Sequence, residues 1–107
     1  QQLDELLATT DRPVMLDFSA DWCVSCIEME QFTFTHPDVA QKMEHMLLLQ
    51  ADVTQNTAAD RELLKRFNLF GPPGIIFFNA QGQEQPDPRV VGFMPADTFA
   101  TELDKVL

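Results

Sequence analysis

Four apolar runs, each of a length typical of a β-strand, divide the chain at intervals. They are rich in Val, Ile, Leu and Phe and cover Val14–Ala20, Met46–Val53, Gly74–Ala80 and Arg89–Met94. Between and around them lie stretches of helical character, namely Leu3–Ala8, Cys23 to about Phe32, Asp38–His45, Thr57–Phe67 and Ala96–Leu107. The hydrophobic pattern therefore predicts four strands that alternate with helices.

The connections between these strands predict how the strands pair. A helical connection joins the first two strands, which implies a parallel pair with a right-handed crossover. The last two strands enclose AQGQEQPDP, which is too short for a crossover helix, so we expect an antiparallel hairpin with a mobile loop over Gln81–Pro88. The predicted fold class is α/β, with a central mixed sheet of about four strands flanked by helices on both faces.

Length and charge narrow the possible functions. The 107 residues, of which 45% are apolar, suit one domain over residues 1–107 with a single core. Seven basic against 17 acidic residues give a net charge of −10, which argues against binding to nucleic acid or to an anionic membrane surface. The chain contains no apolar run of membrane-spanning length and opens with QQLDELL, without Met or a signal segment, so we expect a piece of a longer protein.

The two cysteines of the chain, Cys23 and Cys26, are separated by two residues and follow the first predicted strand. A disulfide across so short a loop adds little stability, whereas a C-x-x-C pair that opens a helix is typical of a redox site. The free N–H groups and the dipole at the helix start stabilise a thiolate at Cys23, which we expect to be the attacking sulfur. Cys26 lies one turn further on and is expected to be the resolving thiol.

A zinc site and inert core cysteines are the alternatives to redox chemistry. Zinc requires about four ligands, but the sequence has no second C-x-x-C, and His36 and His45 are too far apart to form the histidine pair of a zinc finger. We therefore expect no metal, and no cofactor other than the redox-active disulfide itself.

Two acidic residues are candidates for tuning the cysteines. Asp17 lies within the apolar run MLDF, six residues before Cys23. Burial would raise its pKa and allow it to exchange a proton with Cys26. The alternative is that Asp17 faces solvent at a strand edge. Glu30 follows Cys26 by four residues and Cys23 by seven, so all three share one helical face, although a solvated role is the alternative for Glu30.

If both carboxylates lie near Cys23, their charge opposes the helix dipole and raises the thiol pKa. A poorly stabilised thiolate favours the disulfide form, which lowers the reduction potential. The two acids therefore predict an electron donor. An oxidase remains an alternative, because a C-x-x-C motif alone does not fix the direction of exchange.

Two further features flank the cysteines. Trp22 directly precedes Cys23 and is either a core anchor or, as we favour, a wall of the site. The segment FGPPG, residues 70–74, leads into the third strand. A proline entering a strand occupies its first position or a cis turn, and the alternative is a simple break between helix and strand.

These residues together resemble the thioredoxin superfamily over nearly the whole chain, in LDFSADWCVSC, the Gly-x-Pro turn before an apolar strand, and VVGF. Within it, the chain resembles the C-terminal periplasmic domain of DsbD-type transmembrane thiol-disulfide interchange proteins. The supporting segments are ADWCVSC with EMEQFTF, LLLQADVT, LLKRFNLFGPPGIIFFNAQGQE and VVGFM.

The resemblance implies a monomeric electron-relay domain in the periplasm. Such a domain takes electrons from the membrane-embedded part of the same protein and passes them to its N-terminal domain. That domain reduces disulfide isomerases and cytochrome maturation factors.

The resemblance also implies roles for individual residues. Cys23 matches the nucleophile and Cys26 its resolver, Asp17 the buried acid, and Glu30 a second acid near the site. Pro73 matches the superfamily's cis-proline, which faces the cysteines. The residues expected to bind the partner are Trp22, Val24, Pro72, Pro73, Gly92 and Phe93.

The turn before the third strand departs from the superfamily pattern at two positions. Pro72 lacks the N–H that this position usually donates to the partner strand, so one docking hydrogen bond is expected to be absent. Gly74 replaces a more common Thr.

Three functions remain open at this point. They are a DsbD-type relay domain, a free-standing thioredoxin-like protein-disulfide reductase, and a non-catalytic binding module with the same fold. The presence of both cysteines argues against the binding module. The first two functions differ in what is attached to the domain.

Overall fold

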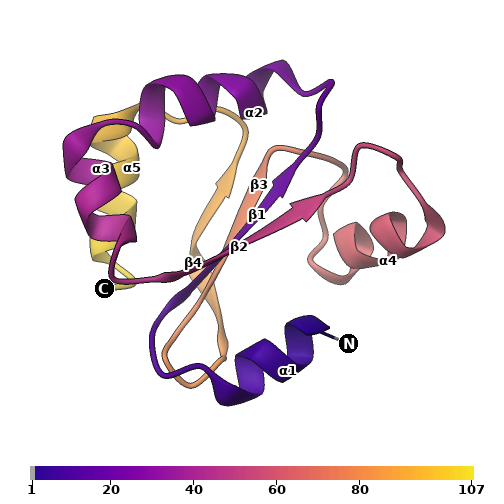
Figure 1. Ribbon diagram of the computed structural model, residues 1–107, viewed down its shortest axis with the longest axis horizontal. Helices are drawn as coiled ribbons and strands as arrows, with labels where there is room; N and C mark the ends of the chain where they lie inside the picture. Colours follow the sequence, from indigo (N-terminus) through magenta and orange to yellow (C-terminus); the bar gives the residue numbers. More distant parts are fainter. Residues whose placement is uncertain (1) are drawn as a thin grey trace.

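The computed structural model describes residues 2–107, and Figure 1 shows a sheet with helices packed around it. In chain order the elements are α1 (Gln2–Thr9), β1 (Val14–Ser19), α2 (Val24–Glu28), a π-helical segment (Met29–Thr33), α3 (Pro37–Met43), β2 (Leu47–Asp52), α4 (Ala58–Arg66), β3 (Gly74–Phe78), β4 (Glu84–Val91) and α5 (Ala96–Asp104). The predicted elements are all present, most of them within one to three residues of their predicted ends.

The sheet has the strand order β2-β1-β3-β4. Strand β1 is parallel to β2 and antiparallel to β3, and β3 is antiparallel to β4. The predicted parallel pair, the antiparallel hairpin and the mixed sheet are therefore confirmed. The chain starts at the inner strand β1, continues to the edge strand β2, returns to the inner strand β3 and ends at the other edge with β4.

Helices cover both faces of the sheet, as predicted. Alternate side chains of β1 point to opposite faces. Phe18 packs in one buried cluster with Leu7 of α1 and Leu64 of α4, whereas Met15 packs in a second cluster with Leu103 of α5. Figure 1 shows the same division, with α2, α3 and α5 gathered on one side and α1 and α4 on the other. Each face therefore has its own apolar core, with β1 between them.

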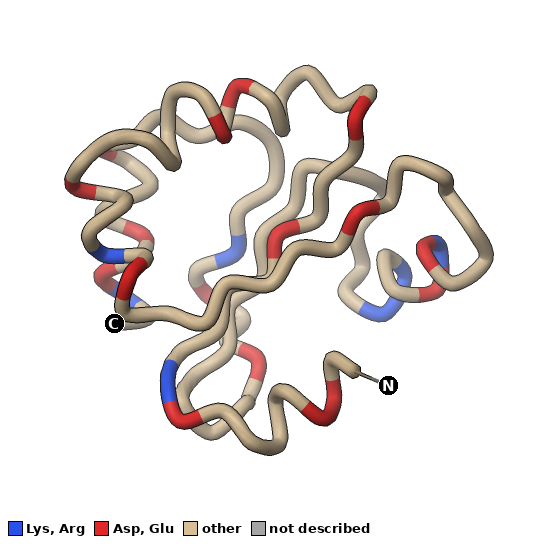
Figure 2. The backbone as a smooth tube through the Cα atoms, viewed as in Figure 1, with Lys and Arg blue, Asp and Glu red and all other residues tan. Residues whose placement is uncertain are grey.

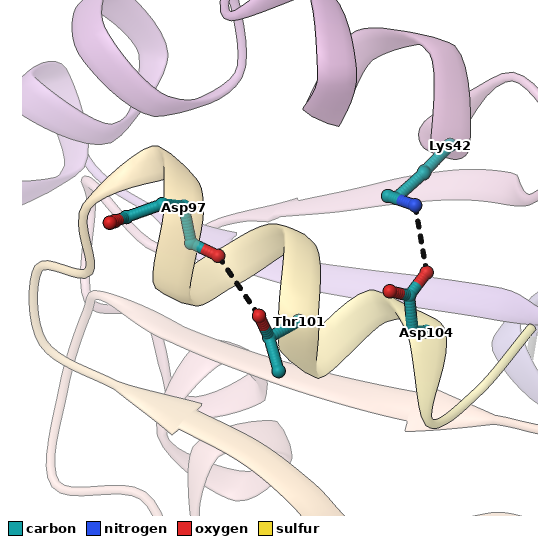
Figure 3. Close-up of polar contacts among 4 residues, drawn as sticks. All are labelled: Lys42, Asp97, Thr101 and Asp104. Carbon is teal, nitrogen blue, oxygen red and sulfur yellow. Dashed lines mark hydrogen bonds and ion pairs between the residues drawn. The ribbon is translucent and has the colours of Figure 1, made fainter.

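Helices α3 and α5 pack against each other on one side of the sheet (Figure 1), and Figure 3 shows polar contacts of these two helices. Lys42 Nζ donates to Asp104 Oδ1 at 2.8 Å across this pair. Within α5, Thr101 Oγ1 donates to the carbonyl oxygen of Asp97 at 3.2 Å. An exposed ion pair contributes about 0–1 kcal/mol. The burial of Phe99, which is 0% exposed, is therefore the stronger attachment of α5 to the sheet.

The prediction of a mobile loop over Gln81–Pro88 is wrong, because β4 begins at Glu84. Glu84 pairs with Phe78 of β3, and the register then shifts between Ile76 and Phe77, which leaves residues 86–88 without partners in the ladder. Prolines cannot donate to a ladder, but β4 is an edge strand and the shift places them outside the pairing. The sequence analysis took the prolines as a loop signal and also extended this strand to Met94, beyond its end at Val91.

Core packing predicts a matched pair of phenylalanine substitutions. Phe77 is 0% exposed, whereas Phe32 is 63% exposed. We expect Phe77→Ala to lower the free energy of unfolding by about 3–5 kcal/mol, because it leaves a cavity in the sheet core. Phe32→Ala should cost less than about 1 kcal/mol. Urea unfolding of the oxidised domain, followed by circular dichroism, measures both. Equal losses in the two variants would contradict this packing.

Candidate active site

Cys23 occupies the N-cap of α2, directly after the turn that ends β1. Its backbone is extended, with φ −89° and ψ 101°, and its Sγ accepts a hydrogen bond from the N–H of Cys26 at 3.2 Å. The sulfur therefore lies where the first N–H groups of the helix are free of intrahelical partners. This is the placement that the sequence predicted for a stabilised thiolate.

Cys23 and Cys26 form a disulfide, with their Cα atoms 5.2 Å apart. Both residues are largely buried, at 6% and 4% exposure, within the cluster on the α1 and α4 side of the sheet. Cys26 Sγ lies 3.9 Å from the carbonyl oxygen of Phe18 in β1. The pair is thus held between the start of a helix and the end of an inner strand.

Asp17 lies in β1 with a strand on each side, opposite Gln50 of β2 and Ile75 of β3. It is half-buried, so the alternative of a solvent-facing residue at a strand edge is wrong. Burial raises the pKa of Asp17 to about 7, and the nearby charge of Glu30 adds to the rise. Near neutral pH this carboxyl group is therefore poised between its neutral and charged forms.

Glu30 lies in the π-helical segment and is itself exposed. It nevertheless shares a cavity of about 230 Å³ with Asp17, lined also by Met15 and Phe34. The structure thus brings Glu30 close to Asp17, whereas the expectation from helical spacing that Glu30 shares one face with Cys23 and Cys26 stays a prediction. The two acids meet between the sheet and the helix that carries the cysteines.

Trp22 forms part of the surface beside the disulfide and does not anchor the core. Its side chain is 59% exposed, and its Nε1 donates to the carbonyl oxygen of Thr54 at 3.1 Å. Thr54 Oγ1 also accepts the backbone N–H of Asp21 at 2.9 Å. Thr54 thus fixes the turn before Cys23. The sequence analysis did not identify Thr54, because these contacts join residues more than 30 positions apart.

The turn into β3 lies next to the cysteines. The Pro72–Pro73 peptide bond is cis, which confirms the prediction for Pro73. The following residue, Gly74, pairs with Phe18, the residue whose carbonyl oxygen lies beside Cys26 Sγ. The N–H of Gly92 donates to the carbonyl oxygen of Pro73 at 3.2 Å. Pro73 therefore directly precedes the residue that pairs with Phe18 and is bonded to Gly92, so it does more than break the chain between helix and strand.

Large apolar side chains are exposed on the segments around the disulfide. They are Trp22, Val24, Phe70, Val91 and Phe93. Trp22, Val24 and Phe93 are among the residues predicted to bind the partner, whereas Phe70 and Val91, which lie within FGPPG and VVGF, are not. Exposed apolar side chains that lie together are common on surfaces that bind other proteins.

A buried contact joins the helix to the segment that contains Phe93. Thr33 is 0% exposed, and its Oγ1 donates to the carbonyl oxygen of Met94 at 2.6 Å. The N–H of Met94 in turn lies 3.3 Å from Met29 Sδ, which accepts it. These bonds position one edge of the surface around the disulfide. No local sequence signal distinguishes Thr33 from a surface threonine, so the sequence analysis did not identify it.

Within residues 2–107, His, Cys, Asp and Glu side chains form no group of three or more that could hold a metal ion. None of the helices in the same range is long and apolar enough to span a membrane.

Comparison with known sequences places this site in a family. The family model described as a thioredoxin-like domain matches residues 1–107. The thiol:disulfide interchange protein DsbD of Ralstonia nicotianae is 60% identical over 98 residues, which are 92% of this chain and 16% of that protein. DsbD of Cronobacter sakazakii is 57% identical over 102 residues, covering 94% of this chain and 18% of that protein. The chain thus spans less than a fifth of the length of these curated relatives.

Solved structures give the same placement. The DsbD C-terminal domain of Neisseria meningitidis in its oxidised form has a TM-score of 0.78 and 38% identity, over 98% of this chain and 89% of that one. Its reduced form has a TM-score of 0.77 and 37% identity, over 98% and 90%. A thioredoxin from Thermus thermophilus has a TM-score of 0.79 and 26% identity, over 98% and 81%. This chain therefore belongs to the thioredoxin-like domain family and, within it, is a relative of the C-terminal domains of DsbD proteins.

Proposed function

We propose that the chain is the electron-relay domain of a DsbD-type protein, and that it donates electrons through Cys23 and Cys26. The observation that carries the proposal is the Cys23–Cys26 disulfide at a helix start in a thioredoxin-like fold. Thiol-disulfide exchange is the chemistry that such a pair supports. The similar Neisseria domain, which has been solved both reduced and oxidised, supports a role in which the pair changes state.

The donating reaction has two steps. The Cys23 thiolate attacks one sulfur of the partner disulfide, so a Cys23–partner bond forms and the other partner sulfur leaves as a thiolate. The Cys26 thiolate then attacks Cys23 Sγ, which restores the Cys23–Cys26 disulfide and releases the second partner sulfur. Two electrons pass to the partner, whose two sulfurs take up protons. An upstream dithiol reduces the domain again by the same steps in reverse.

Asp17 and Glu30 favour the donating direction in this proposal. With a pKa of about 7, Asp17 is suited to take the proton of the Cys26 thiol as that thiol attacks and to return it later. Glu30 keeps the pKa of Asp17 high, and both charges oppose a thiolate at Cys23. A less stable thiolate makes the dithiol a stronger reductant, in line with the prediction from the sequence.

The partner is proposed to bind across Trp22, Val24, Pro72, Pro73, Gly92 and Phe93. The exposure of the three large apolar side chains in this set and the bond between Gly92 and Pro73 support a continuous surface. Because Pro72 has no N–H, the partner strand forms one hydrogen bond fewer at this point than the family pattern allows.

The setting of the domain is also proposed. Residues 1–107 form one domain of a longer protein, without a cofactor other than the disulfide. Its electrons come from a membrane-embedded part of that protein and go to a partner domain in the periplasm. The names of the relatives and the small share of their length that the chain spans support this setting.

A free-standing reductase is the second candidate, supported by the TM-score of 0.79 to the Thermus thioredoxin. If the full-length protein has apolar membrane-spanning segments before this domain, the domain is the relay domain and not a free-standing reductase.

The reduction potential tests the direction of electron flow. We expect the Cys23–Cys26 couple to have a potential below about −200 mV, near the roughly −270 mV of thioredoxin. Equilibration with defined dithiothreitol and glutathione buffers, followed by trapping of free thiols, measures it. A value near the roughly −120 mV of a strong oxidase would contradict the donor function.

Single cysteine substitutions test the two steps. Reduced Cys26→Ser should form about one equivalent of a stable mixed disulfide with oxidised insulin, because the resolving thiol is missing. Cys23→Ser should form almost none. Non-reducing electrophoresis with mass spectrometry measures both. A Cys23→Ser variant that traps insulin as well as Cys26→Ser does would reverse the assignment of nucleophile and resolver.

The raised pKa of Asp17 predicts a pH-dependent stability. The folded chain holds this proton up to pH about 7, whereas the unfolded chain releases it near pH 4, so the contribution is complete below pH 4 and is lost as pH rises through 7. The loss is at most about 4 kcal/mol. Urea unfolding of the oxidised domain at pH 5 and pH 8 measures how far the free energy of unfolding decreases between these two pH values. In Asp17→Asn this decrease should be smaller than in the wild type, because the titrating carboxyl group is missing. A decrease as large in Asp17→Asn as in the wild type would contradict the assignment.

The thiol pKa tests both acids together. In the reduced domain, Asp17→Asn combined with Glu30→Gln should lower the pKa of Cys23 by about one unit or more, because two nearby negative charges are removed. Thiolate absorbance at 240 nm against pH measures it. The exposed pair Asp11→Asn with Glu44→Gln makes the same change in charge elsewhere and is the control. Equal shifts in the two double variants would show that only net charge matters.

A further inference from the structure

A groove of about 480 Å³ lies along the C-terminal half of α4 and the segment that leads to the cis-proline turn. Its floor contains Leu64 and Leu69, which belong to the same buried cluster as Cys23 and Cys26. Phe70, at its rim, is separated from Pro72 by a single residue. The groove therefore lies on the α4 side of the sheet, the side whose buried cluster contains the cysteines, and next to the segment that leads to the cis-proline.

Hydrogen bonds connect the groove to the turn before Cys23. Trp22 Nε1 donates to the carbonyl oxygen of Thr54, in the loop between β2 and α4. Two residues further on, Asn56 lines the groove, and its carbonyl oxygen accepts a hydrogen bond from Arg61 Nη1 at 2.6 Å. A molecule in the groove would thus contact the loop that holds Trp22 in place.

The groove carries two cations in a chain with a net charge of −10. Arg61 and Lys65 both line it, one helical turn apart on α4. Figure 2 shows the basic positions of α4 in blue among the acidic positions of the chain. The ion pairs within residues 2–107 use Lys42, Arg66 and Lys105, so neither groove cation has a carboxylate oxygen within 4.0 Å there. Like charges at this spacing repel and destabilise a helix. In the described part of the chain, no carboxylate in direct contact with either cation offsets this repulsion.

Phe70 adds an apolar contact at the rim of the same groove. Its side chain is 108% exposed, so it makes almost no contact with the rest of the domain. Covering such a side chain with a partner is favourable, at roughly 25 cal/mol per Å² of apolar surface removed from water. The groove thus combines two cations that lack an ion pair with an exposed aromatic ring. This combination favours a ligand that has both a negative charge and an apolar group.

We propose that this groove docks an acidic segment of the protein whose disulfide exchanges with Cys23. A carboxylate of that segment lies against Arg61 and Lys65, and a neighbouring apolar side chain covers Phe70. The inference rests on the proposed function, since the occupant is the exchange partner. Because most of the domain surface repels acidic proteins, the groove sets where such a partner approaches and favours its association.

Two synthetic peptides with one cysteine each test the proposal. The cysteine is held in a disulfide with 2-nitro-5-thiobenzoate, and one peptide carries Glu-Leu-Glu where the other carries Gln-Leu-Gln. The acidic and the neutral peptide are each made in two versions, one with the triplet four residues before the cysteine and one with it four residues after. The reduced domain becomes the Cys23–Cys26 disulfide, while the peptide disulfide is reduced to a peptide thiol and a coloured thiobenzoate. Stopped-flow absorbance at 412 nm gives the second-order rate constant.

Lys65→Glu and Arg12→Glu are the matched variants. Both residues are exposed and without an ion pair in the part of the chain that the structure describes, and each substitution changes the net charge by the same amount. In at least one placement of the triplet, Lys65→Glu should lower the ratio of acidic to neutral peptide rates about threefold or more at low salt. Arg12→Glu should change that ratio much less. Equal changes in the two variants, or no change in either, would overturn the docking site.

Two further results separate the parts of the inference. Phe70→Ala should slow the acidic peptide about twofold or more, and an unchanged rate would remove Phe70 from the docking surface. The wild-type rate with the neutral peptide tests the proposed function by itself. A reduced domain that releases no thiobenzoate from the neutral peptide would contradict thiol-disulfide exchange, whatever the charge of the groove.

Discussion

The pairing of β1 on both of its edges is the constraint on which the site depends. Because β1 lies between β2 and β3, its last residues and the helix that follows are held in one place. Cys26 Sγ lies beside the carbonyl oxygen of Phe18, and the same residue pairs with Gly74, directly after the cis-proline. A single inner strand thus positions the disulfide, the half-buried Asp17 and the cis-proline turn.

The electrostatics of the site follow from the same strand. An inner strand desolvates the carboxyl group of Asp17, and the helix above it brings Glu30 near, so the pKa of Asp17 rises to about 7. In the proposed relay, the helix start favours a thiolate at Cys23, whereas the two acids oppose it. The balance between these effects sets how strongly the domain holds its electrons. In this view, a small number of charges near the disulfide tunes a fold that many oxidoreductases share.

The surface around the disulfide differs on its two sides. Glu30, Asp21 and Asp52 line a cavity of about 300 Å³ along β2, whereas Arg61 and Lys65 line the groove on α4. A partner that approaches the exposed side chains of Trp22 and Phe70 therefore meets opposite charges to either side. Such an arrangement favours one orientation of the partner, because the reverse orientation would bring like charges together.

The sequence by itself determined the strands, their pairing, the helix that follows Cys23 and the place of Asp17 within an apolar strand. These features depend on local patterns, namely apolar runs, short connections and the spacing of two cysteines. Tertiary structure alone decided the role of Thr54, the buried bond of Thr33, the extent of β4 and the groove beside Phe70. Each of these depends on contacts between segments far apart in the chain, such as the 61 positions that separate Thr33 from Met94. A local pattern carries no information about which distant backbone will lie within hydrogen-bonding distance once the sheet has formed.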